Sequence, residues 1–126
     1  AEFHGEFIDF DPSWAWPKPV KEKGPRVMLG GAPGPTIFQH IAEFGNGWMP
    51  IGGSGIKASL SDLQKVCESK ERDFSEISII PFGTVPDQGK LDYFEELGVD
   101  EVILRVPAGP REHVLETLDS YVSFLK

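Results

Sequence analysis

The chain has 126 residues, which suits one domain, and its 40% hydrophobic and 25% charged residues are those of an ordinary globular protein. Its formal net charge of −8 gives an acidic surface that repels phosphate backbones, so we expect no nucleic-acid partner. The apolar runs are far shorter than the roughly 20 residues of a membrane-spanning helix, and no leader pattern opens the sequence. We therefore expect a cytoplasmic protein with no membrane partner. The single Cys67 leaves no internal disulfide and no metal-ligand spacing, so no metal site is expected.

Residues 1–25 are predicted to form an extended arm rich in aromatic residues and proline. Apolar and polar residues alternate over 3–10, which predicts a strand or hairpin. Prolines exclude helix from the remainder. Trp14 and Trp16 stand among them, and tryptophans on an extended segment normally pack against a larger body. Because the chain opens with Ala1 inside this pattern, we interpret it as a fragment or a processed chain.

Residues 26–126 repeat a strand–loop–helix unit. Short apolar runs with strand character recur every 20 to 30 residues or so, the period of successive βα units. Between them, apolar residues at a spacing of three and four are typical of amphipathic helices. The predicted strands are 26–30, 47–51, 76–81 and 101–106, and the predicted helices are 35–44, 57–71, 88–97 and 110–125.

Several details of these elements follow from the same patterns. Thr36 is the expected cap of the first helix, and Ile37, Ile41 and Phe44 are expected on its inner face. The segment 83–86 is predicted to be a loop after the third strand. The helix over 110–125 is expected to turn its apolar residues inward.

Four consecutive units of this kind curl into a barrel arc or lie in a flat doubly wound sheet. A closed barrel takes eight strands, so the predicted fold class is α/β, one half of a (β/α)8 TIM barrel with four parallel units. The exposed edges of such an arc would cause aggregation unless they were covered. The arm, a second copy of the chain or a missing half of the barrel would cover them.

Glycines follow the first two predicted strands. Gly30 and Gly31 end the first, and 52–55 reads Gly-Gly-Ser-Gly after the second. Ligands of parallel α/β folds lie at this end of the strands, where loop amides and helix N-termini point. Glycine lets the backbone approach such a ligand closely. A tight turn without any ligand is the alternative for both runs.

Five blocks of sequence occur in an order that carries a family resemblance. They are Gly5-Glu-Phe-Ile-Asp-Phe10, Trp16-Pro-Lys-Pro19, Val27-Met-Leu-Gly-Gly31, Gly47-Trp-Met-Pro50 and Leu97-Gly-Val-Asp-Glu-Val-Ile-Leu104. Together they resemble the C-terminal part of the bacterial luciferase-like monooxygenase superfamily. Within it the likeness is to oxidoreductases that use the deazaflavin coenzyme F420, with FMN-dependent members as the alternative. The resemblance covers essentially the whole chain.

The resemblance implies a barrel whose mouth holds the coenzyme ring against the backbone that follows one strand. Carried over by position, the implied cofactor-binding residues are Met28, Leu29, Gly30, Gly31 and Ala32. The implied reaction is hydride transfer between this deazaflavin or flavin and a small-molecule substrate. Full-length members carry the acid or base residues on earlier strands, which have no counterpart here. We therefore expect no catalytic residue in this chain and no turnover by it alone.

Two other functions are open. Gly52, Gly53, Ser54 and Gly55 offer backbone amides that bind anions at a strand end, and Arg111 after the last strand would add a cation for a phosphate or substrate. A flexible connector and a solvated helix start are the structural alternatives for these residues. The other function is a non-catalytic half-barrel that self-associates as a homodimer.

The remaining conspicuous residues are predicted to be structural. Trp48 and Cys67 are expected in the core. His40 and His113 have no companions at ligand spacing and are expected on the outward faces of their helices.

Overall fold

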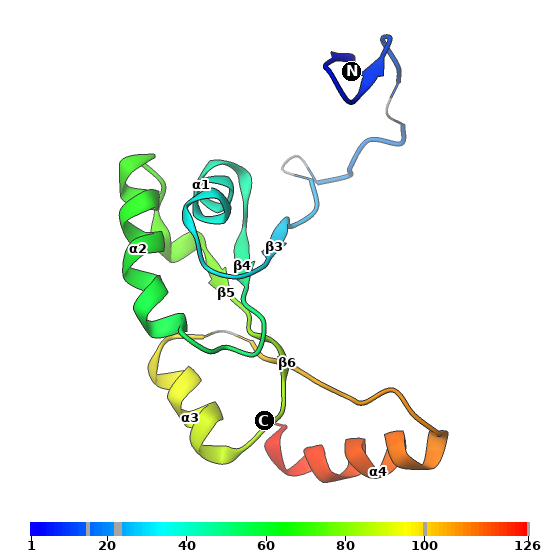
Figure 1. Cartoon of the computed structure of the whole chain (residues 1–126), viewed down its shortest axis with the longest axis vertical. Helices are drawn as coiled ribbons and strands as arrows, with labels where there is room; N and C mark the ends of the chain where they lie inside the picture. Colours follow the sequence, from blue (N-terminus) through cyan, green and yellow to red (C-terminus); the bar gives the residue numbers. More distant parts are fainter. Residues whose placement is uncertain (15, 22–23, 100, 126) are drawn as a thin grey trace.

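Parallel strands separated by helices form the body of the protein, as a computed structural model describes it for residues 1–14, 16–21, 24–99 and 101–125. Within these residues the fold is mixed α/β, and helices α1 and α2 lie on one side of the strands (Figure 1). The strands are β1 (Phe3–His4), β2 (Asp9–Phe10), β3 (Met28–Gly30), β4 (Gly47–Met49), β5 (Ser78–Ile79), β6 (Phe82–Thr84) and β7 (Ile103–Leu104). The helices are α1 (Pro35–Phe44), α2 (Ile56–Ser69), α3 (Gln88–Glu96) and α4 (Arg111–Tyr121), with short 3-10 helices η1 (Phe74–Glu76) and η2 (Val122–Phe124).

The strands of the body lie side by side in chain order. β3, β4 and β5 form one parallel sheet, and β6 and β7 form a second parallel pair. The Ile80 amide donates to the Trp48 carbonyl at 2.9 Å and the Phe82 amide to the Pro50 carbonyl at 2.8 Å. Because these bonds continue the β4–β5 ladder into β6, the two sheets join into one parallel arrangement.

The third strand differs from the single run predicted over 76–81. It starts later, because the Asp73 side chain accepts a hydrogen bond from the Ser75 amide and caps η1. Pro81 has no amide hydrogen and divides the strand into β5 and β6. The segment 83–86, predicted to be a loop, supplies Gly83 and Thr84 to β6.

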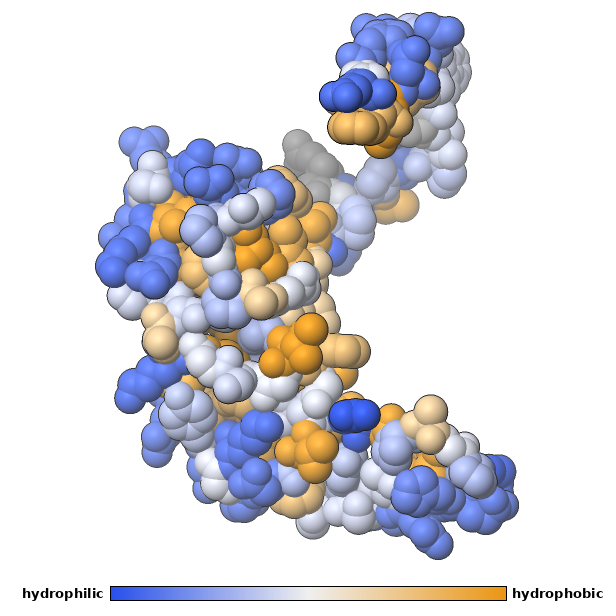
Figure 2. Space-filling view, viewed as in Figure 1, coloured by the Kyte–Doolittle hydropathy of each residue, from blue (hydrophilic) through white to orange (hydrophobic). Residues whose placement is uncertain are grey.

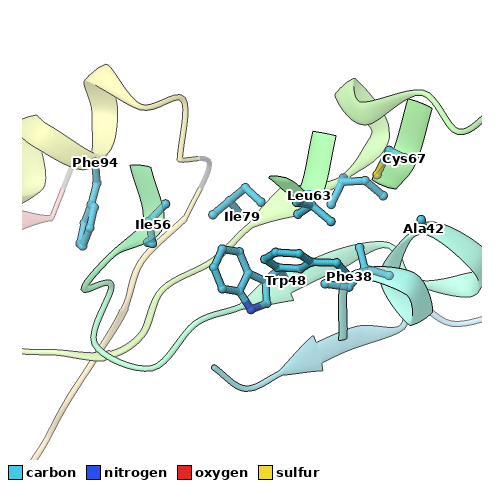
Figure 3. Packing of buried hydrophobic residues seen from close by; sticks show 10 residues of the cluster. Phe38, Ala42, Trp48, Ile56, Leu63, Cys67, Ile79 and Phe94 are labelled. Atoms are coloured by element: carbon cyan, nitrogen blue, oxygen red, sulfur yellow. The ribbon is translucent and has the colours of Figure 1, made fainter. Parts of the chain in front are cut away.

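The core lies between the strands and the helices α1 and α2. Trp48 from β4 is fully buried, and its ring meets the ring of Phe38 edge-on at 5.4 Å (Figure 3). Cys67 and Leu63 of α2 complete this region, so the predicted core positions of Trp48 and Cys67 are confirmed. Buried aromatic and aliphatic area of this kind stabilises a fold at about 25 cal/mol per Å².

Helix α1 begins and turns differently from the prediction. Its N-cap is Gly34 with Pro35 as the first helical residue, and no side chain caps it, so the Thr36 cap was wrong. Proline suits this position because its fixed φ is helical and its missing amide hydrogen would be unpaired there. Phe44 is 54% exposed, whereas Phe38 takes the inner place that was expected for it.

The N-terminal arm and the first turns of α4 stand away from the body, and the molecule has the outline of an open crescent (Figure 1). The C-terminal residues Phe124 and Leu125 return to it and line a cavity with α3 and β7. The predicted hairpin forms from β1 and β2, but Trp14 and Trp16 are 90% and 69% exposed rather than packed on the body. None of the eleven residues of α4, all of them described, is buried, so the expected inward face is wrong. Among the described helices, none is long and apolar enough to cross a bilayer.

Candidate functional site

An open cavity of about 510 Å³ lies at the carboxyl end of β3, the edge strand of its sheet. One wall is the loop that follows β3 and the other is the first two turns of α1. Four of the five residues expected to bind the coenzyme come together here. The cavity is lined by Leu29, Gly30, Gly31, Ala32, Gly34, Pro35, Thr36, Ile37 and His40.

The loop at the cavity is held from beneath by the core. The Gly31 amide donates to the Met49 carbonyl at 3.3 Å, and the Trp48 indole Nε1 donates to the Gly31 carbonyl at 3.0 Å. Trp48 is itself fixed by its burial against Phe38. The two bonds couple the position of the loop directly to the position of the core.

The local structure constrains the two glycines of the loop differently. Gly31 has φ +150°, and a Cβ there would lie 3.2 Å from Ile37 Cδ1, so the local fold favours glycine. Gly30 has no positive φ, and a Cβ would find Met49 O as its nearest neighbour at 3.8 Å, an ordinary contact. The fold therefore accepts a Cβ at Gly30 without overlap, as it does at Gly34 in the same cavity.

Helix α1 presents its N-terminus to this cavity. The first hydrogen bond of the helix runs from the Phe38 amide to the Gly34 carbonyl at 3.1 Å. Gly34 has no side-chain acceptor for the amides of the first turn. Helix N-termini carry partial positive charge and favour anionic groups. The cavity thus combines an apolar wall of Leu29 and Ile37 with an electropositive end.

His40 and Thr36 line the cavity although the sequence reasoning gave neither of them a place there. His40 was expected on an outward face and is exposed, but the helix brings it beside Thr36 and Ile37 at the cavity. Residues three and four apart share a helix face. The spacing of positions 36, 37 and 40 in the sequence therefore predicts that they lie on one face of the helix. Phe44, one turn further, has its ring 5.6 Å from the His40 ring.

The fifth residue of the expected coenzyme set, Met28, lies elsewhere. Its side chain packs against the backbone of Gly47 on β4, where a Cβ would overlap it. Successive strand residues point to opposite faces, so Met28 and Leu29 do not line the same space.

Some residues of the alternative phosphate site are needed to hold the fold itself. The Gly52 amide donates to the Phe82 carbonyl at 2.7 Å, and a Cβ on Gly53 would overlap the Phe94 ring. Gly55 has φ +76° at the N-cap of α2. Arg111 is the first residue of α4 and is exposed. Three of the four backbone positions therefore serve the fold, and the phosphate site stays a prediction.

The displaced pKa values of the protein have causes outside the cavity. A hydrogen bond and the charge of Lys70 lower the pKa of Glu43, hydrogen bonds from Ser75 lower that of Asp73, and burial raises that of Cys67. Within the described residues, no three His, Cys, Asp or Glu side chains gather as a metal site. His40 is the one titratable side chain that lines the cavity in the described structure.

The comparisons with known proteins give relatives but no family. No protein-family model matches the chain. It is 38% identical over 109 residues, 85% of its length, to the uncharacterized proteins Mb0978c of Mycobacterium bovis and MT0980 and Rv0953c of Mycobacterium tuberculosis. The matched segment makes up 38% of each relative, so the chain spans well under half the length of the curated relatives it matches.

Proposed function

We propose that this chain is the C-terminal half of a luciferase-like (β/α)8 oxidoreductase that binds coenzyme F420, with FMN as the alternative coenzyme. The observation that carries the proposal is the cavity at the end of β3, where Gly30 is bare without a structural need. A bare backbone surface next to a helix N-terminus can accommodate a flat ring system or its anionic tail.

The arrangement of strands supports the half-barrel part of this proposal. Parallel strands that follow one another in chain order are what successive units of a (β/α)8 barrel form. β3 and β7 are the outer strands of the described arrangement, and a closed barrel leaves no such edge. The relatives are long enough to supply further units. A missing N-terminal half or a second copy would then complete the walls of the barrel. The assembled protein would be cytoplasmic.

The residues of the cavity fit the coenzyme in named roles. The backbone of Gly30 and Gly31 would lie against the ring, with Leu29 and Ala32 flanking it. Trp48 holds that backbone in place through the Gly31 carbonyl, and Ile37 excludes water from one side of the cavity. The bound coenzyme supplies hydride transfer with a small-molecule substrate. Because this chain forms only one side of the site, it orients the coenzyme and turns over no substrate by itself.

The substitution Gly30→Ala tests the proposal, with Gly89→Ala in α3 as its matched control. Both positions accept a Cβ, at 3.8 Å and 3.6 Å from the nearest atom, so neither change should disturb folding. We expect Gly30→Ala to weaken binding of F420 or FMN about tenfold, roughly 1.4 kcal/mol, and Gly89→Ala to leave it unchanged. Fluorescence titration measures the binding, and thermal unfolding checks the fold.

Two results would contradict the coenzyme assignment. One is that neither F420 nor FMN binds saturably to the unsubstituted chain at millimolar concentration. The other is that Gly30→Ala and Gly89→Ala bind equally well, since the cavity of β3 would then not be the site.

The exposed arm favours a second candidate, a half-barrel that self-associates without catalysis. Phe7, Trp14 and Val20 are each at least 90% exposed, an unusual apolar surface for a monomer. Sedimentation over a range of concentrations would show a dimer if this function holds. A monomer at every concentration, with coenzyme binding intact, would remove it.

A further inference from the structure

A second cavity, of about 490 Å³, lies at the carboxyl ends of β4 and β7, beside the first residues of β6. Its lining consists of Ile51, Phe82, Gly83, Leu104, Arg105 and Val106. None of these residues lines the cavity at β3. Figure 2 shows hydrophobic side chains gathering on the hollow side of the crescent near β6.

The apolar side chains of this cavity are exposed although they belong to strands or strand ends. Ile51 is 73% exposed, Phe82 49% and Val106 38%. Scattered exposed apolar residues are ordinary, but a contiguous group that lines a concave space indicates a ligand. The apolar part of a ligand would therefore be removed from water in this cavity.

The backbone around the cavity is fixed from several directions. Ile51 and Phe82 form a parallel bridge, and Gly83 has φ +74° at a register shift between β6 and β7. The Arg105 amide donates to the Thr84 carbonyl at 2.8 Å, and the Tyr121 hydroxyl donates to the Arg105 carbonyl at 3.0 Å. Such a surface is formed before any ligand arrives, which reduces the entropy lost on binding.

Arg105 gives the cavity its charge. Among the side chains that the structure describes, Arg105 forms no ion pair within 4.0 Å, and no Asp or Glu lines the cavity. By contrast, the cavity between α3 and β7 is lined by Glu95 and Glu101. The chain has a net charge of −8, so an arginine without a counter-ion beside apolar side chains gives this cavity a preference for anionic ligands. A guanidinium recognises carboxylate, sulfonate or phosphate by charge-assisted hydrogen bonds.

We propose that this second cavity binds a small molecule with an apolar body and one anionic group, the anion being recognised by Arg105. The inference rests on the proposed oxidoreductase function only in identifying this molecule as the substrate. The cavity and the coenzyme site lie at the same end of parallel strands, which is where the two reactants of a barrel enzyme meet.

The test uses two probes of similar shape that differ in charge. 1-Anilinonaphthalene-8-sulfonate carries an anionic group, whereas N-phenyl-1-naphthylamine is neutral, and the fluorescence of both rises in apolar surroundings. We expect Arg105→Gln to weaken sulfonate binding about tenfold and to leave binding of the neutral probe unchanged. The matched control is Arg26→Gln, another exposed arginine, which lines neither cavity and should leave both affinities unchanged. Ile51→Ser, at the apolar wall, should weaken both probes.

The outcomes separate this proposal from the coenzyme assignment. Equal sulfonate affinity of Arg105→Gln and the unsubstituted chain would overturn the proposal, and so would an equal loss for both probes or the same loss in Arg26→Gln. Gly30→Ala, which addresses the cavity at β3, should not change either probe. If F420 and FMN fail to bind but the Arg105 result holds, the binding site stands and only the coenzyme assignment falls.

Discussion

Trp48 links the core of this protein to its candidate site. The residue was predicted to pack in the core, and it is fully buried there. Its indole nitrogen also donates to the Gly31 carbonyl, a contact that no sequence pattern indicates because it joins residues 17 positions apart. A hydrogen bond of this kind is worth about 1 kcal/mol. Its larger effect is to fix the backbone that lines the cavity at β3.

At the residue scale, Gly53→Ala should destabilise the protein more than Gly52→Ala. Both glycines have positive φ, 78° and 67°, so both changes incur a left-handed backbone cost of about 1–2 kcal/mol. Only at Gly53 would the new Cβ overlap the Phe94 ring, and overpacking adds roughly 1–3 kcal/mol. Urea unfolding of both variants measures the difference. Equal losses would show that the Phe94 contact has no energetic weight.

At the scale of elements, the sequence predicted which helices and strands exist and in what order. The pattern failed where a single residue overrides it, as Pro81 does in the third strand. It also failed for the burial of α4, which is a helix as predicted but has no buried residue in the described structure. Of the site, the run Leu29 to Ala32 was predicted. His40 was not, because its place depends on how α1 is rotated against β3.

Helix α4 should open more easily than α2. No residue of α4 is buried, whereas Leu63 and Cys67 of α2 are fully buried, and burial sets the free energy of local opening. The Tyr121 hydroxyl anchors α4 to the Arg105 carbonyl at 3.0 Å. We expect amide hydrogen exchange to be faster throughout α4, and Tyr121→Phe to accelerate it further by about fivefold, the equivalent of roughly 1 kcal/mol. Exchange as slow as in α2 would contradict this description of α4.

The ion pair between Glu43 of α1 and Lys70 after α2 should give a small, pH-dependent stability. The Lys70 nitrogen lies 2.9 Å from Glu43 Oε1 and holds the pKa of this carboxyl below its ordinary 4.5. A lowered pKa in the folded state stabilises the protein above the unfolded value, and the contribution is lost as pH falls through the folded value. Glu43→Gln should therefore be slightly less stable at neutral pH and equal to the unsubstituted chain at strongly acidic pH. Thermal unfolding without denaturant at both pH values measures the stability of the variant and of the unsubstituted chain. A stability difference that persists in acid would exclude the ion pair as its cause.

At the scale of the whole molecule, the parallel strands form an open arrangement with a hollow side. Two cavities lie at the carboxyl ends of its strands, one at β3 and one at β4 and β7 beside the start of β6. The arm and α4 extend beyond the body with much of their apolar surface exposed. This combination is compatible with half of a barrel, which is the architecture of the proposed function.

The most direct test of the account is an NMR titration of the ¹⁵N-labelled chain with F420 and, separately, with FMN. The account predicts saturable shifts of backbone amides from Leu29 to Ala32 and at Thr36, Ile37 and His40, with the amides of α3 and α4 unmoved. It would be contradicted if millimolar coenzyme left the amides around Gly30 and Gly31 unshifted, or if the saturable shifts clustered at another part of the molecule.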